Sequence, residues 1–202
     1  MTGTSTDRPL RRRRGDLAPR PELWAVLEQG ARLRRILEDF YALVYADPVL
    51  APFFEGVPRE RIVGQQYGFL AEIFTGEKIY CGDRPRNAHH WMVISDELFD
   101  HREALMEGCL RRHGLPEPLI RDWMALEEIF RKQIVKERPI PKRVRGVDLP
   151  LDGYETLRMA AGAVCDACHG EIPVGAEAVS HVRTGRTCCT ACAVRPSRGA
   201  SP

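Results

Sequence analysis

The sequence lacks any long hydrophobic run. None of its apolar stretches approaches the roughly 18 residues of a membrane span, and the positive N-terminal region has no apolar signal-peptide core after it. No glycine-rich fingerprint of a flavin or nicotinamide site is present, and no segment repeats. We therefore expect a cytoplasmic protein without a membrane span.

Net charge is also small. The 202 residues carry 30 Lys and Arg against 28 Asp and Glu, a formal charge of +2 that argues neither for nor against a polyanionic partner. Basic residues gather instead near the start, where Arg11–Arg14 have almost no apolar company. Residues 1–20 are predicted to be a disordered basic tail, able to touch nucleic acid or acidic lipid but more often simply solvated, and residues 196–202 a second disordered tail.

Apolar residues at three- and four-residue spacing predict amphipathic helices between residues 21 and 137. Pro21 opens a short helix that Gly30 ends, and a second stripe runs from Leu33 to Val44. A third helix begins near Pro58, and Ser95 is predicted to cap a fourth. The clearest stripe predicts one long core helix that ends before Pro139 and contains Leu119, Trp123, Leu126, Phe130 and Ile134.

The segments between and after these helices are expected to be irregular. Tyr80–Ala88 has the composition of a loop. Residues 138–161 are predicted to be a linker with one helical turn in the segment GYETLRMA.

Five segments in order carry a family resemblance: ILEDFY (36–41), ADPVLAPFFEG (46–56), QQYGFLAEIFTG (65–76), YCGDRPRNAH (80–89) and ISDELFD (94–100). Together they resemble the truncated, two-on-two haemoglobins, closest to the first group of that family. The resemblance covers roughly Trp24 to Val135 and has no gap from Val57 to His89. It implies an all-α, two-on-two truncated globin fold over residues 21–137 that binds haem b.

The resemblance also implies roles for single residues. His89 matches the proximal iron ligand, Tyr41 and Gln66 match distal hydrogen-bond donors to the gas ligand, and Ile62 matches a distal gate. A neutral imidazole is the form that haem iron takes, and a glutamine within an apolar stripe needs a polar partner. Aromatic and aliphatic walls of the pocket are implied at Phe40, Phe54, Phe69 and Leu70.

Plainer interpretations of these residues stay open. On its own, His89 is a loop histidine at the surface, and His90 is a rival ligand because adjacent side chains cannot both face one iron. Tyr41 can be an ordinary core tyrosine, and Gln66 can face solvent.

The sequence departs from the family at three places. Glu28-Gln29-Gly30 replaces the glycine pair that follows the first helix, which leaves the turn there undefined. Glu103 lies near the position that is tryptophan in the other truncated groups. His90 and Trp91 are unusual directly after the proximal site.

Five of the seven cysteines fall between residues 165 and 192. Two C-x2-C pairs separated by 20 residues predict a closed, structural zinc site in a module spanning residues 162–195, whose ligands are Cys165, Cys168, Cys189 and Cys192. A unit this small needs the metal to fold. Cys188, His169 and His181 are poorer candidate ligands, and a thiol-disulfide tail is the remaining alternative.

The function implied by the resemblance is binding of a diatomic gas (O2, NO or CO), with nitric oxide dioxygenation or peroxidase-like turnover as further activities. Turnover would need a separate reductase, because the sequence has no flavin or nicotinamide fingerprint. A second hypothesis is a gas or redox sensor whose zinc module contacts a protein or nucleic acid. A third is a haem-free globin-like scaffold.

Overall fold

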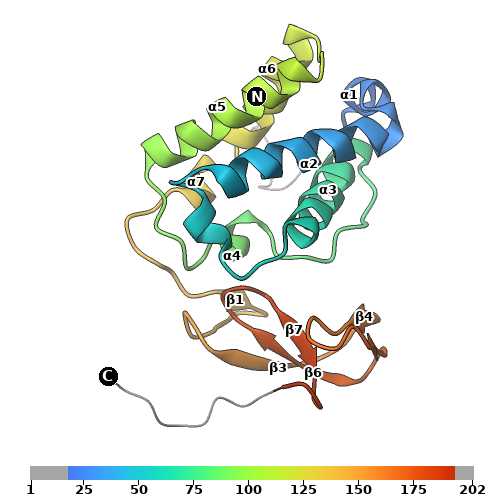
Figure 1. The fold of residues 1–202 in the computed structure, drawn as a ribbon, viewed down its shortest axis with the longest axis vertical. Helices are drawn as coiled ribbons and strands as arrows, with labels where there is room; N and C mark the ends of the chain where they lie inside the picture. The colour runs from blue at the N-terminus through green and yellow to red at the C-terminus, as the bar shows by residue number, and fades with distance from the viewer. Residues whose placement is uncertain (1–17, 194–202) are drawn as a thin grey trace, which may run out of the picture.

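The computed structural model describes residues 18–193, in which a helical part is followed by a strand-rich part (Figure 1). The predicted tails therefore lie outside the described residues, apart from residues 18–20. No helix in the described range has both the length and the apolar character needed to cross a membrane. The helical part consists of α1 (Pro21–Val26), η1 (Glu28–Gly30), α2 (Ala31–Ala46), η2 (Ala51–Phe54), α3 (Arg59–Thr75), α4 (Pro85–Ala88), α5 (Asp96–Arg112), α6 (Glu117–Glu128) and α7 (Arg131–Ile134).

Several helix ends follow from the local sequence signals. Pro58 directly precedes α3, and Gly76 ends it in the left-handed conformation with φ of 79°. Ser95 caps α5 as predicted, because its hydroxyl accepts a hydrogen bond from the amide of Leu98 at 3.2 Å. Gly114, with φ of 67°, follows the end of α5.

The core forms where the apolar stripes meet. α2 packs against both α3 and α5, and α5 packs against α6. The predicted stripe of α2 is buried along its length, and its apolar residues join those of the other helices in one cluster. The largest fully buried side chains include Phe40, Phe74 and Trp123.

The prediction of one long helix through Ile134 is wrong. α6 ends at Glu128, and the amide of Phe130 bonds the carbonyl of Glu127, three residues back, at 2.9 Å. Such tightening ends a helix. The ring of Phe130 then lies edge-on to Phe69, with centroids 5.5 Å apart, while Ile129 is left 52% exposed. The predicted loop before His89 also contains a short helix, α4.

The remainder of the described chain is rich in strands, so the all-α prediction holds only for the helical part. The predicted helical turn in GYETLRMA is wrong, because Tyr154–Arg158 forms β3 and pairs antiparallel with β6. One sheet has the order β3-β6-β7, and two strand pairs accompany it, β1-β2 and β4-β5. The strands are β1 (Arg143–Val144), β2 (Val147–Asp148), β3 (Tyr154–Arg158), β4 (Ala163–Val164), β5 (Glu171–Ile172), β6 (Glu177–His181) and β7 (Thr187–Cys189).

The turn between α1 and α2 is made without a glycine pair. Glu28 and Gln29 both adopt positive φ, at 54° and 52°, and Gly30 follows at 101°. A Cβ built on Gly30 would lie 2.2 Å from the hydroxyl oxygen of Tyr67 and 2.8 Å from the ring of Trp24. Only glycine satisfies both the conformation and the close approach at this position.

Gly30→Ala should therefore lower the free energy of unfolding by about 2 kcal/mol, from left-handed strain and crowding together. The measurement is denaturant unfolding of the two proteins side by side. Gly64→Ala is the matched control, because Gly64 lies in α3 with nothing within 4 Å of its built Cβ. That change should stabilise by about 0.5–1 kcal/mol. A neutral Gly30→Ala would contradict the tight packing of this turn.

Candidate functional site

A cavity of about 390 Å³ is lined mostly by residues of the helical part. Its size falls in the range of about 300–1,000 Å³ typical of small-molecule and cofactor sites. α2, α3, α4, α5 and α6 all contribute residues to its lining. The structure brings together at this cavity every pocket residue predicted from the sequence: Phe40, Tyr41, Phe54, Ile62, Gln66, Phe69, Leu70 and His89.

His89 lies directly after α4, which positions its ring. Its Nδ1 lies 2.8 Å from the carbonyl oxygen of Pro85, one helical turn back. Because a carbonyl only accepts, Nδ1 carries the proton and Nε2 keeps its lone pair. Burial lowers the pKa of His89 to about 4, so the imidazole is neutral near pH 7. A neutral ring with one nitrogen fixed and the other available is the state in which histidine binds metals.

Tyr41 supplies a buried hydroxyl from α2. Its ring is 7% exposed and packs edge-on against Phe40 and Phe54, with centroids 5.0 and 5.9 Å away. Burial raises the pKa of Tyr41 well above its usual range, so the hydroxyl stays protonated. Gln66, on α3, lines the same cavity, and neither side chain forms a hydrogen bond with another residue of the 18–193 range. Two donors therefore remain free for a small polar ligand.

A half-buried cluster of charged residues, not predicted from the sequence, borders the cavity. Arg102 forms ion pairs with both Glu103 and Glu127, and its guanidinium lies 4.8 Å from the centroid of Phe40. Burial and the neighbouring Glu127 raise the pKa of Glu103 to about 8. One guanidinium is thus shared between the two carboxyl groups. The available signal was a charge at Glu127 within an otherwise apolar stripe.

Part of the cavity wall comes from outside the helices and was not predicted from the sequence. Val182, Arg183, Thr184 and Gly185, in the turn between β6 and β7, line the same cavity. Trp91 lines it too, and the unusual tryptophan after His89 was the signal that could have pointed to this contact.

The four predicted cysteine ligands come together in the strand-rich part. The sulfur atoms of Cys165, Cys168, Cys189 and Cys192 all lie within 4.8 Å of one another. Amide groups of Cys168, Cys189 and Ala167 lower the pKa of the Cys165 thiol to about 6. Hydrogen bonds with Cys168 and Cys189 raise that of Cys192 to about 12. A bound cation would offset the repulsion between thiolates held this close together.

Cys188 is not part of this group of four, and neither are His169 and His181, the other candidate ligands. The ring of His181 instead contacts Asp152 at 3.2 Å and lies edge-on to Tyr154.

Helices α2, α3, α5 and α6 around a cavity with one fixed, neutral histidine define a globin-type ligand pocket. The comparison with known families agrees, because the model of the bacterial-like globins matches residues 25–136. The chain belongs to the family of bacterial-like globins. Membership implies haem-based ligand binding.

Individual relatives point the same way. The chain is 28% identical over 88 residues to the group 1 truncated hemoglobin GlbN of Mycolicibacterium paratuberculosis, a match that covers 44% of this chain. This chain spans 65% of the length of that relative.

Solved structures share the fold of the helical part. The truncated hemoglobin of Tetrahymena pyriformis in its Fe(III) form superposes with a TM-score of 0.53 at 23% identity, over 56% of this chain and 97% of that one. The 2/2 hemoglobin of Synechococcus sp. PCC 7002 gives a TM-score of 0.51 at 22% identity, over 55% and 97% of the two chains. Both matches concern the fold alone.

Proposed function

We propose that the protein binds haem b through His89 and uses the pocket to bind a diatomic gas, dioxygen or nitric oxide. The observation that carries the proposal is the hydrogen bond between His89 Nδ1 and the Pro85 carbonyl. It supports Nε2 of His89, rather than a nitrogen of His90, as the ligand to iron. His90 is directed elsewhere, with its Nε2 3.3 Å from the Val182 carbonyl.

The pocket residues fit such a cofactor. Apolar side chains dominate the cavity walls, as a porphyrin face requires, and the histidine offers a lone pair without first losing a proton. The buried charges of Arg102, Glu103 and Glu127 are paired among themselves and therefore do not oppose an apolar ring.

The chain's own residues account for the selectivity of the site. When bound, haem supplies an iron centre able to bind a diatomic gas and to exchange electrons. Tyr41 and Gln66 donate hydrogen bonds toward a gas ligand that carries partial negative charge, and the aromatic walls exclude water. Nitric oxide dioxygenation or peroxidase-like turnover would draw electrons from a separate reductase, so we propose reversible gas binding as the basic activity.

Tyr41→Phe should increase the dissociation rate of dioxygen about tenfold, because one hydrogen bond to a charged ligand contributes about 1.5–3 kcal/mol. Stopped-flow release from the ferrous protein is the measurement. Tyr45→Phe is the matched control on the same helix, since the Tyr45 hydroxyl donates to the Val57 carbonyl at 2.8 Å. Equal dissociation rates in the two variants would contradict the role of Tyr41.

We also propose that the four clustered cysteines bind one zinc ion as a closed structural site. The mutual proximity of their sulfur atoms supports it, and four thiolates without an open position suit a structural rather than a hydrolytic zinc. In this role the metal stabilises the small sheet, whose buried cluster among the described residues consists of Cys165, Ile172 and Ala178.

A further inference from the structure

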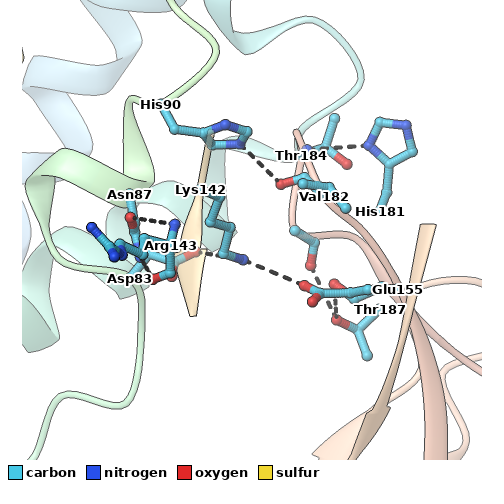
Figure 2. A network of polar contacts seen from close by, with 12 residues as sticks. Asp83, Asn87, His90, Lys142, Arg143, Glu155, His181, Val182, Thr184 and Thr187 are labelled. Atoms are coloured by element: carbon cyan, nitrogen blue, oxygen red, sulfur yellow. Dashed lines mark hydrogen bonds and ion pairs between the residues drawn. The ribbon is translucent and has the colours of Figure 1, made fainter. Parts of the chain in front are cut away.

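The strand-rich part lies against the helical part through buried polar contacts. Nε2 of His90, a residue only 1% exposed, lies 3.3 Å from the Val182 carbonyl, as Figure 2 shows. Lys142, 8% exposed, reaches Asp83 at 3.0 Å and Glu155 at 3.5 Å, and so joins the segment before His89 to β3. A buried lysine needs paired carboxylates, so this contact fixes how the strand-rich part lies against the helices.

A second anchor holds the turn between β6 and β7. Arg61, on α3, pairs with Asp166 at 2.6 Å and also donates to the carbonyl of Gly185. Asp166 in turn accepts a hydrogen bond from the amide of Thr187 at 2.7 Å. The turn is therefore fixed from both the α3 side and the His90 side, with its residues 182–185 along the cavity.

The charges that line the cavity single out one residue of this turn. Among the lining residues within the described range, the cations are Arg102 and Arg183. Arg102 is occupied by Glu103 and Glu127. Arg183 forms no ion pair with any residue between 18 and 193, and its guanidinium lies over the ring of Trp91, 5.0 Å from the centroid. A guanidinium stacked on an aromatic ring keeps its donors free for a carboxylate.

We propose that the strand-rich part, residues 143–193 and called the C-terminal module below, completes the haem pocket. In this proposal Arg183 binds a propionate carboxylate of the haem. Haem carries two such carboxylates on one edge, and within residues 18–193 Arg183 is the uncommitted cation at the cavity wall. This inference rests on the haem binding proposed above. It accounts for both departures after the proximal site, since His90 and Trp91 contact the module instead of the iron.

The test is the rate of haem release to an excess of apomyoglobin, measured for the full chain and for Arg183→Gln. We expect release about fivefold faster in the variant, as befits a partly exposed charge pair. Arg186→Gln is the matched control, because Arg186 is an exposed arginine of the same hairpin that does not line the cavity. Its release rate should equal that of the unmodified protein, and Arg183→Lys, which keeps the charge, should fall between.

Faster haem release from Arg183→Gln could come from a lost carboxylate contact or from a loosened module. Haem dimethyl ester distinguishes the two, because its propionates carry no charge. The difference between Arg183→Gln and the unmodified protein should vanish with the ester. Equal haem release from both proteins, or a difference that persists with the ester, would overturn the assignment of Arg183. If the unmodified protein binds haem and the ester equally well, and Arg183→Gln changes the release rate of neither, this inference alone is overturned. Failure of the unmodified protein to take up either compound would overturn the haem-binding proposal as well.

Discussion

His89→Ala should abolish the Soret band of the protein purified after expression with ample haem. Loss of a group that merely orients a metal ligand costs about 10- to 100-fold in metal affinity. We therefore expect removal of the ligand itself to weaken haem binding by more than about 100-fold. The measurement is a haem titration of the apoprotein followed by absorption of the ferric, ferrous and CO-bound forms.

His90→Ala is the matched control, because it removes the neighbouring histidine and the contact with Val182 but leaves the Nδ1 contact of His89 with Pro85. Its spectrum should retain the Soret band. Loss of the band in His90→Ala together with its retention in His89→Ala would assign the iron to His90. A colourless unmodified protein would favour the haem-free scaffold.

Cys165→Ser should remove zinc from the protein and unfold the strand-rich part. Cys165 is fully buried, and its sulfur accepts hydrogen bonds from the amides of Ala167 and Cys189 at 3.4 and 3.3 Å. Structural zinc contributes about 10–16 kcal/mol of apparent binding free energy in small domains, far more than a cluster of three buried residues supplies. The zinc content measured by elemental analysis should fall from one ion per chain to none. Hydrogen exchange should show loss of protection in β3, β6 and β7.

Cys188→Ser is the control for a general effect of losing a thiol. Cys188 neighbours Cys189, but its sulfur is not one of the four that all lie within 4.8 Å of one another, so this variant should keep one zinc per chain and a protected sheet. Zinc loss in Cys188→Ser, or a full zinc complement in Cys165→Ser, would contradict the proposed ligand set.

Local signals were sufficient to predict most of the helical part. Ser95 caps α5 and Gly76 ends α3 because capping and left-handed termination depend on a few adjacent residues. The candidate pocket residues were placed by their order along the chain, and the structure brings them to one cavity. Their roles toward haem remain proposals.

The errors arose where distant contacts decide local structure. Phe130 and Ile134 continue a helical stripe, yet the helix breaks at Ile129, and Phe130 packs on Phe69, which lies on α3. Likewise, Tyr154–Arg158 has no strong helix or strand pattern, and it becomes a strand because β6 pairs along its whole length. Neither partner is visible within a window of neighbouring residues.

The charged cluster at the cavity has the same origin. Arg102 and Glu103 are adjacent in α5, but Glu127 comes from α6, and only the packing of these two helices brings the three groups together. A departure from the family pattern proved more informative than agreement, since His90 and Trp91 mark the surface on which the strand-rich part lies.

The position of the β6–β7 turn in the cavity wall has a consequence for biosynthesis. Val182 follows its contact residue His90 by 92 positions, so the ribosome completes the helices and His89 well before it makes this wall. Domains fold largely as units during synthesis, the N-terminal one first. The nascent pocket is therefore open on one side for a period in which the cofactor can enter. Folding of the strand-rich part around the cysteine cluster would then close this opening.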